Sequence, residues 1–534
     1  MAVDLKIWWR KWWFGVALAG LMIACEVAML VMALGQTPPG MRWLGNLVFN
    51  ATDYPYYLSY LKQGAASLLV KNLYNDLGPI VRFEPFWSTG GLLVRMGLPP
   101  IAAHEILRWI GTLFLGLAFF AVTRDLYTDT KRSRIACLIA ASGLGTGWLF
   151  AISAHLAQQK ILVPIPPDVS SEFGLLPILF GGAHMIYSLA LQFLIARWTW
   201  LLLGQGDKKY LWPDLAVVFL LASFHPYYIP LIGLMAVICF TAGRLTGKVR
   251  PRFIWFLGIC LCLLPSTLYN FWLTMQDATL GNLYLQANHL PLAGWMFWTM
   301  SLSAIIIAGL FMVFKRVPKD YHWSVKPNWA WVWLLSAILC LFLPVPWTAK
   351  YTQGLLSVLA ILTLPFWLWL WEISLIRLRR FESVVVALGA VMLSGPLLYY
   401  FFLASLIAKP EVRTLFYQPE AVFAAWRYLE TDAPSEAVII SSDMDANLWT
   451  PTYASRPVWV AHEHLTPDFD RRTTGLADWR ISDDARLFNA MLTENHIEYI
   501  LSLDRKEEQR YAALLNADWK SVFGQDEVTL YAKQ

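Results

Sequence analysis

The chain has 534 residues, of which 57% are hydrophobic and only 15% are charged. Soluble proteins carry roughly a quarter charged residues, so this composition excludes an ordinary soluble protein and indicates an integral membrane protein of many spans. The net charge is +5, but the basic residues lie in short segments between apolar runs, which argues against nucleic-acid binding.

Apolar runs long enough to cross a bilayer recur along the chain from residue 12 to residue 407. The first follows Lys6, Arg10 and Lys11, and it exceeds the apolar region of a cleaved signal peptide, which is about 7–15 residues, so we expect it to remain as a signal anchor. Spans are expected over about eleven segments: 12–34, 103–123, 135–153, 180–203, 212–224, 227–243, 253–273, 293–314, 328–344, 352–375 and 384–407.

The distribution of basic residues predicts the orientation. With the N-terminus in the cytoplasm, the inner segments hold twenty Lys and Arg, whereas the longer outer loops hold seven. Because Lys and Arg concentrate on the cytoplasmic side, this bias favours a cytoplasmic N-terminus in a plasma (inner) membrane. An odd number of spans then predicts that the C-terminal segment is extracytoplasmic.

The long first outer loop, residues 35–102, contains three acids. Asp76 and Glu84 are interpreted as solvated loop acids. Asp53 stands in the tract Asn50–Tyr60, among aromatic residues that include Tyr54 and Tyr57. These neighbours predict an ordered, semi-buried position, which packing alone explains poorly and chemistry at the outer face explains well.

The second outer loop carries Asp168 and Glu172, which are four residues apart and would share one face of a helix. A divalent cation is conceivable there, but two carboxylates are a weak signal, and we favour no metal. His184, at the head of the next span, is either a hydrogen-bonded structural residue or a substrate contact. Both readings stay open from the sequence.

Two further outer positions are candidates for binding. His225 precedes Pro226 between two short spans, and interrupted spans tend to line binding sites. Lys350 is the basic residue of the short fifth outer loop, within expected reach of a lipid phosphate. The alternatives are that His225 caps freed helix ends and that Lys350 snorkels to the interface. Within the spans, Glu26 and Arg197 are expected to make structural pairs.

From about residue 409 charged residues become frequent, and the pattern predicts a small α/β domain. Short β-type runs (437–441, 458–460, 498–503 and 528–532) alternate there with helical ones (419–430, 483–495 and 505–516). The expected division is a membrane domain over 1–408 and an extracytoplasmic domain over 409–534. In the latter, His462 and His464 flank Glu463. Two histidines on an irregular segment are interpreted as solvated rather than as metal ligands.

These pieces, in their order, resemble the GT-C-type integral membrane glycosyltransferases that use polyprenyl-phosphate sugars, in particular a bacterial branch that ends in an α/β domain. The residues that carry the resemblance are Asp53–Ser59 after span one, His104–Arg108 opening span two, Ser142–Trp148 in span three, Ala183-His184 opening span four and His225–Tyr227. The resemblance implies a GT-C-like fold and an inverting transfer of a sugar to an acceptor hydroxyl at the outer face.

The resemblance also implies roles for single residues. Asp53 matches the family's catalytic base, and Lys350 matches a position near the donor phosphate where the family usually has arginine. We place His225, His184 and Glu172 in substrate binding, and Tyr54 and Tyr57 around the acceptor or sugar. The acid pair that some members carry in the first loop is absent, since tyrosine follows Asp53, and no paired metal acids are clearly matched.

The expected partners are a polyprenyl-phosphate sugar, an acceptor of unknown kind (lipid, glycan or protein) and membrane lipid. The alternative is a transporter or flippase, which predicts ionisable residues at mid-membrane and two related halves. The polar residues gather instead at the outer span ends, and the long first loop has no counterpart in the second half. A non-catalytic assembly or sensor protein is a third reading, in which the outer domain binds a partner.

Overall fold

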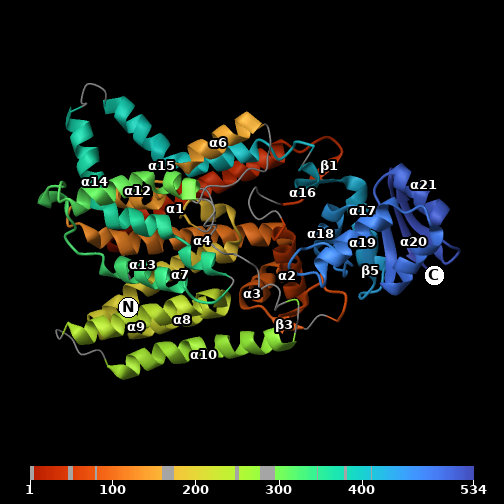
Figure 1. Ribbon diagram of the computed structural model, residues 1–534, viewed down its shortest axis with the longest axis horizontal. Helices are drawn as coiled ribbons and strands as arrows, with labels where there is room; N and C mark the ends of the chain where they lie inside the picture. The colour runs from red at the N-terminus through yellow and green to blue at the C-terminus, as the bar shows by residue number, and fades with distance from the viewer. Residues whose placement is uncertain are drawn as a thin grey trace. The chain divides into compact units, whose positions relative to one another are not determined.

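The structure is a computed structural model (Figure 1). It describes residues 5–45, 52–78, 81–158, 173–246, 252–276, 279, 295–345, 347–377, 382–410 and 412–534. These residues form two compact units. The first lies within Met1–Leu30, Ile106–Asn270 and Ala287–Leu406, and the second within Val31–Glu105, Phe271–Gln286 and Ile407–Gln534.

The first unit consists mainly of long apolar helices, some of which continue into the second unit. They are α1 (Leu5–Gly35), α4 (Pro100–Thr123), α5 (Thr130–Ser142), α6 (Gly147–Gln158), α7 (Ala183–Thr199), α8 (Leu211–Phe224), α9 (Ile229–Leu245), α10 (Phe253–Gln276), α12 (Trp295–Val313), α13 (Asn328–Cys340), α14 (Leu355–Arg377) and α15 (Glu382–Ala404). Short helical turns join them: η1 (Arg124–Leu126), η3 (Pro177–Phe180), η4 (Trp200–Gly204), η5 (Lys208–Tyr210), η6 (Pro226–Tyr228), η8 (Lys319–Tyr321) and η9 (Thr348–Thr352).

Each of the eleven predicted spans coincides with helix. Seven helical segments among the described residues are long and apolar enough to cross a membrane, and shorter apolar helices cover Ser301–Val313, Asn328–Cys340 and Ser394–Ala404. The third predicted span is divided into α5 and α6, because Gly143 ends α5 with a φ of +69°. The expected helical membrane architecture is therefore confirmed.

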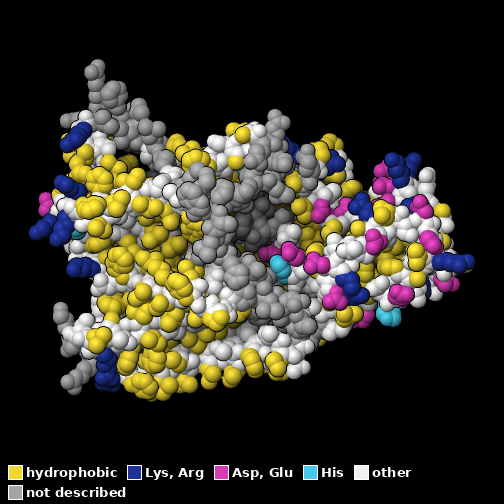
Figure 2. All heavy atoms as spheres, viewed as in Figure 1, with side chains coloured by type: hydrophobic (Ala, Val, Ile, Leu, Met, Phe, Trp, Pro, Cys, Tyr) yellow, Lys and Arg dark blue, Asp and Glu magenta, His cyan; other side chains and the backbone are white. Residues whose placement is uncertain are grey.

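The surface of α10 shows why these helices belong in lipid. Leu257, Leu261, Leu264 and Leu268 recur at helical spacing and are 36%, 56%, 46% and 58% exposed. In water, exposing this stripe would cost roughly 25 cal/mol of free energy for each Å² of apolar surface. Hydrophobic side chains likewise dominate the surface of the long helices in Figure 2. The chain is a membrane protein with many spans.

The two odd charges within the spans make the expected structural pairs. Glu26 is fully buried, lies 3.5 Å from the Arg108 Nε atom and accepts a hydrogen bond of 2.5 Å from the Thr112 hydroxyl. Arg197 pairs with Asp125. A buried charge is tolerated when it is paired and hydrogen-bonded, so both residues are explained by packing of the bundle.

The second unit begins with the first outer loop. Its elements are β1 (Met41–Trp43), α2 (Tyr54–Ala66), β2 (Leu69–Val70), β3 (Arg82–Phe83) and α3 (Pro85–Arg95). Strand β1 pairs antiparallel with β4 (Tyr417–Pro419), so the first loop and the C-terminal segment share a two-stranded sheet. Strands β2 and β3 pair antiparallel with each other.

The C-terminal segment is an α/β domain, as predicted. Its sheet has the order β5-β6-β8-β7, from β5 (Val438–Ser441), β6 (Ile497–Ser502), β8 (Val528–Lys533) and β7 (Trp519–Gln525). Strands β5 and β6 are parallel, and the other pairs are antiparallel. Its helices are α16 (Arg413–Phe416), α17 (Glu420–Asp432), α18 (Met444–Tyr453), α19 (Phe469–Ile481), α20 (Ala485–Glu494) and α21 (Arg505–Leu514).

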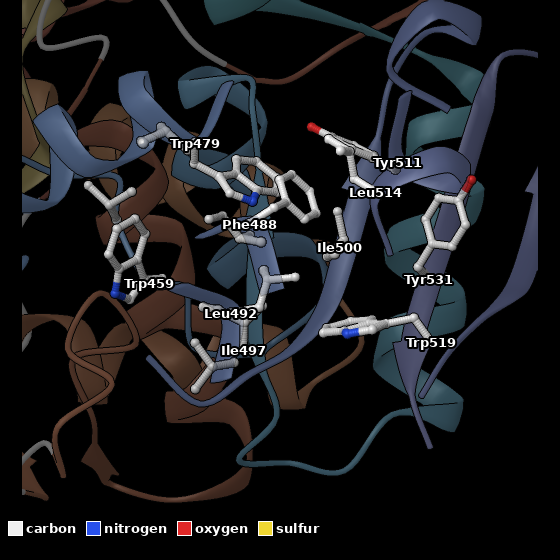
Figure 3. Close-up of a cluster of buried hydrophobic side chains, with 14 residues drawn as sticks. Trp459, Trp479, Phe488, Leu492, Ile497, Ile500, Tyr511, Leu514, Trp519 and Tyr531 are labelled. Atoms are coloured by element: carbon white, nitrogen blue, oxygen red, sulfur yellow. The ribbon is translucent and has the colours of Figure 1, made fainter. Parts of the chain in front are cut away.

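The core of this domain is an aromatic stack between helices and sheet (Figure 3). The Trp479 ring stacks on Phe488 with centroids 4.9 Å apart and on Tyr511 at 5.2 Å. Ile497 and Ile500 of β6 are fully buried in the same cluster. A core of this size indicates that the domain has an interior of its own rather than a loose tail.

Helices α2 and α3 approach each other at two glycines. A Cβ atom built on Gly91 would lie 2.3 Å from the carbonyl carbon of Gly64, so no side chain fits. We predict that Gly91→Ala pushes α2 and α3 apart and destabilises the protein by about 1–3 kcal/mol. Thermal unfolding in detergent measures this change. Gly20→Ala in α1 is the control, because nothing lies within 4 Å of its added Cβ, and an equal loss in both variants would contradict the prediction.

Candidate functional site

Asp53 lies at the start of α2, where the expected ordered and semi-buried position is confirmed. Its backbone carbonyl accepts a hydrogen bond from the Tyr57 N–H, but its side chain makes no capping bond to the helix. The side chain is 38% exposed. Because the first turn of a helix carries partial positive charge, this position favours an ionised carboxylate that solvent or a substrate can reach.

The partner of Asp53 comes from the C-terminal segment. The Nε2 atom of His462 lies 3.1 Å from the Asp53 Oδ1 atom, and the His462 side chain is only 4% exposed. The interpretation of His462 as a solvated histidine is therefore wrong. Sequence patterns could not show it, because the two residues are 409 positions apart and lie in segments without a shared motif.

The hydrogen bonds around His462 define which ring nitrogen carries the proton. The backbone N–H of His464 donates to the His462 Nδ1 atom at 3.2 Å, so Nδ1 is the unprotonated nitrogen. In the neutral imidazole the proton is then on Nε2, which donates to the Asp53 carboxylate. His462 thus holds the carboxylate through a donated hydrogen bond and is not itself placed to take a proton from it.

A tight turn fixes the His462 ring. The Thr466 hydroxyl accepts hydrogen bonds from the backbone N–H groups of Ala461 and His462, at 3.3 and 3.2 Å. The Thr466 N–H in turn donates to the His462 carbonyl at 2.9 Å. The turn therefore fixes the backbone of His462, and the bond from the His464 N–H to Nδ1 sets the direction of its ring.

Tyrosines surround this pair. The rings of Tyr74 and Tyr56 lie 5.7 and 6.5 Å from His462, between centroids. Burial above all, with the neighbouring Tyr60 and Asp53, holds the pKa of Tyr74 well above its usual value. The Tyr74 hydroxyl donates to the Leu448 carbonyl at 2.9 Å. Tyr74 therefore stays neutral, and the basic group beside His462 is the Asp53 carboxylate.

Tyr54 and Tyr57, the other predicted residues of this tract, point into packed surroundings. Tyr54 is 4% exposed, and its hydroxyl lies 3.3 Å from Glu105 Oε1. Tyr57 is 6% exposed and stacks on Trp87 with centroids 4.6 Å apart. The Trp87 ring also stacks on His104, whose Nδ1 atom is 3.3 Å from Glu105. These contacts tie α2 to α3 and to the start of α4.

The two other acids of the first loop serve in ion pairs. Asp76 is bonded to Arg472 at 2.7 Å, with both side chains at most 5% exposed, so its interpretation as a solvated acid is wrong. Glu84 is 28% exposed and lies 2.8 Å from Arg82, which also donates to the Tyr60 hydroxyl. Both acids already face a guanidinium, and Asp53 is bonded to the His462 imidazole.

The first unit brings together two of the predicted binding residues on one side of α7. The rings of His184, at the start of α7, and His225, at the end of α8, have centroids 5.1 Å apart. The Ser188 hydroxyl donates to the His184 carbonyl at 2.8 Å and lies 3.0 Å from His225 Nδ1. Since that hydroxyl proton is used, His225 Nδ1–H is the donor to Ser188 Oγ.

Lys350 lies in η9, half-buried, and its charge acts on the His225 ring. Around it, Trp347 donates to the Tyr351 hydroxyl at 3.0 Å, and the Tyr227 ring packs against Trp347 at 5.6 Å. The three predicted residues His184, His225 and Lys350 therefore gather, although 41 positions separate His184 from His225 and 125 separate His225 from Lys350. Their role in binding stays a prediction.

The expected second-loop acids lie outside the described residues, so Asp168 and Glu172 have no structural account here. Within the ranges that the structure describes, no group of three or more His, Cys, Asp or Glu is arranged to hold a metal ion. The divalent cation that the sequence left open, although we favoured no metal, has no ligand set in this part of the chain.

A cavity of about 730 Å³ lies in the C-terminal domain, where the parallel strands β5 and β6 end. Asp443, Asp445, Asp504 and Glu507 are among its lining residues. Asp443 and Asp504 accept hydrogen bonds from backbone N–H groups at the starts of α18 and α21. These two acids are explained by helix capping.

Comparison with known proteins gives a likeness to solved structures alone. No protein-family model matches the chain, and no curated protein matches it. The apo ArnT from Cupriavidus metallidurans is 12% identical, with a TM-score of 0.47 and 97% of this chain and 98% of that one covered. The same enzyme bound to undecaprenyl phosphate is 13% identical, with 96% and 98% covered and a TM-score of 0.47. The apo oligosaccharyltransferase from Archaeoglobus fulgidus is 12% identical, with 99% and 75% covered and a TM-score of 0.46. At this identity and these scores, the likeness assigns the chain to neither protein's family.

Proposed function

We propose that this protein is an inverting glycosyltransferase that moves a sugar from a polyprenyl-phosphate donor to an acceptor hydroxyl. The observation that carries the proposal is the accessible Asp53 carboxylate, held by a neutral His462 and lying on a segment that follows the first span. Asp76 and Glu84, the other described acids of that loop, are in ion pairs with arginines.

The chemistry requires one base. The acceptor oxygen attacks the anomeric carbon, its proton passes to the Asp53 carboxylate, and the bond from that carbon to the phosphate oxygen breaks. The phosphate leaves as an anion and needs no proton, unlike the alkoxide expelled in glycoside hydrolysis, where a second carboxyl group acts as the acid. Single displacement inverts the anomeric configuration. General-base catalysis of this kind contributes roughly 10²–10⁴-fold.

The gathered residues of the first unit supply what a departing phosphate needs. Lys350 provides a cationic donor, and its charge acts on the His225 ring, whose centroid lies 5.1 Å from that of His184. Fixed donors aimed at developing negative charge stabilise a transition state without reorganising at the moment of reaction. We assign these three residues to the donor phosphate, and Asp53 to the acceptor.

The same proposal covers the placement in the cell envelope. The excess of Lys and Arg in the inner segments supports a cytoplasmic N-terminus and an extracytoplasmic C-terminal domain. Asp53 would then act at the outer face, where the sugar of a flipped lipid carrier is available. The acceptor is a hydroxyl of a lipid, glycan or protein, and we assign no metal to the step.

Removing the Lys350 charge is expected to weaken donor binding. A hydrogen bond to a charged group contributes about 1.5–3 kcal/mol, so Lys350→Ala should raise the Kd for a polyprenyl-phosphate sugar by roughly ten- to hundredfold. Lys350→Arg keeps the charge and should stay near wild type. Equilibrium binding of a radiolabelled donor in detergent measures the change. Unaltered binding in the alanine variant would remove Lys350 from the donor site.

The experiment that tests the function places purified protein in liposomes with radiolabelled polyprenyl-phosphate sugars and candidate acceptors. The glycosyltransferase proposal predicts label covalently attached to a new acceptor, with unlabelled polyprenyl phosphate left behind. Label that changes leaflet while still joined to its lipid would support the flippase instead and overturn the proposal.

A further inference from the structure

We infer that His462 of the C-terminal domain is a positioning residue for the catalytic base, so that the domain completes the acceptor site. The inference rests on the proposed function for its catalytic meaning. Its structural basis is the hydrogen bond from His462 Nε2 to Asp53 Oδ1. It gives the C-terminal domain a role in the reaction that its α/β fold alone does not suggest.

The geometry supports orientation rather than proton transfer. In the neutral ring Nε2 carries the proton, and the one basic lone pair is on Nδ1. That lone pair already accepts the His464 N–H, so His462 cannot receive a proton from Asp53. In the reaction the acceptor proton therefore ends on Asp53, and His462 keeps its own proton throughout. A donated hydrogen bond favours the charged form of a carboxylate, which keeps the base ionised and pointed in one direction.

The surroundings show that His462 is built into place. The ring is 4% exposed, the Thr466 hydroxyl fixes its backbone, and the Asn72 side chain donates to the Leu465 carbonyl at 2.8 Å. The Val458 N–H donates to the Leu73 carbonyl at 3.0 Å. The first loop and the C-terminal segment are thus bonded on both sides of the histidine, so the Nε2–H is preorganised toward Asp53.

A purely structural clamp is the competing explanation, and a matched control separates the two. Lys62, also in α2, donates to the carbonyls of Thr452 and Tyr453 at 3.1 and 2.8 Å and pairs with Glu430. Lys62→Met therefore removes another tie between the same two segments without touching Asp53. If His462 were only a clamp, its loss would behave as the loss of Lys62 does.

The test compares wild type, His462→Leu, His462→Gln and Lys62→Met. The amide nitrogen of glutamine lies near the place of a histidine Nε2 and restores the donor, whereas leucine does not. The first readout needs no substrate: dicyclohexylcarbodiimide modifies protonated carboxyl groups, and mass spectrometry follows its attachment to Asp53 as pH changes. We expect the labelling midpoint to rise by about one pH unit in the leucine variant, a tenfold change in the protonation equilibrium. It should stay near wild type in the other two.

The second readout is transfer from the radiolabelled polyprenyl-phosphate sugar that the wild type uses. His462→Leu should lower kcat by up to about a hundredfold with KM for the donor little changed, and His462→Gln should recover much of it. An unmoved labelling midpoint in His462→Leu, or equal behaviour of the leucine and Lys62→Met variants, would overturn the inference. A shifted midpoint in a protein that transfers no sugar would uphold the contact and contradict the proposed function instead.

Discussion

Replacing Asp53 with asparagine is expected to lower kcat for sugar transfer by about 10²–10⁴-fold, the range that general-base catalysis supplies. Asparagine keeps the size of the side chain and can still accept the hydrogen bond from His462, but it cannot take the acceptor's proton. Donor binding should therefore persist, because Asp53 is assigned to the acceptor. Initial rates and equilibrium donor binding, measured on the same preparation, separate the two effects.

Glu84→Gln is the matched control for this substitution. Glu84 is in the same loop, is 28% exposed and pairs with Arg82, so it tests the loss of a loop charge without the loss of the base. We expect it to retain most of the activity. Transfer that survives Asp53→Asn but collapses in Glu84→Gln would move the base from Asp53 to Glu84.

The second large effect concerns stability. Asp76→Leu is expected to lower the free energy of unfolding by about 3–5 kcal/mol, because it leaves the Arg472 charge buried without its partner. Burial raises the pKa of Asp76 even though Arg472 acts to lower it, so desolvation of the carboxylate outweighs the attraction. In Arg472→Met the remaining carboxyl group can bind a proton, and its cost should shrink as the pH falls.

The double variant Asp76→Leu, Arg472→Met separates the cost of an unpaired buried charge from the contribution of the pair itself. Since both charges and their desolvation are removed together, it should be close to wild type in stability. Thermal unfolding in detergent measures all three variants. A double variant as unstable as Asp76→Leu would show that the pair itself, rather than an orphaned charge, sets the stability.

Much of the architecture was predictable because apolar length and charge bias act locally. Each of the eleven apolar runs contains helix, and the predicted β-type runs 437–441, 498–503 and 528–532 overlap strands β5, β6 and β8. The pairing of Glu26 and of Arg197 followed from the cost of a charge in a packed bundle. These features depend on a residue's own neighbours in the sequence.

The elements that were not predicted depend on distant contacts. Helix α19 has a mostly polar sequence and is held by Leu476 and Trp479, which enter the domain core. Strand β7 pairs with β8 although four of its seven residues are exposed. The run at Val458–Val460 forms a single bridge to Ile439 instead of a strand. Local sequence patterns carry little information about secondary structure that depends on tertiary contacts.

The candidate site also has features that the local sequence indicates and features that depend on distant contacts. The aromatic neighbours of Asp53 indicated an ordered acid, and the interrupted spans at His225 indicated a polar cluster, which the structure forms with His184 and Lys350. The sequence does not indicate which residues pair with the acids of the first loop. His462 and Arg472 reach Asp53 and Asp76 from about 400 residues away, so the sequence around each acid does not contain the group that decides its role.

Sugar transfer with Asp53 as its base is tested most directly by donor cleavage that depends on both acceptor and Asp53. Purified wild type and Asp53→Asn would be incubated with a panel of radiolabelled polyprenyl-phosphate sugars, with and without candidate acceptors. The label transferred and its anomeric configuration would then be determined. We expect transfer with inversion by the wild type and its near loss in the variant, with donor still bound. Retained configuration, or equal transfer by both proteins, would contradict it.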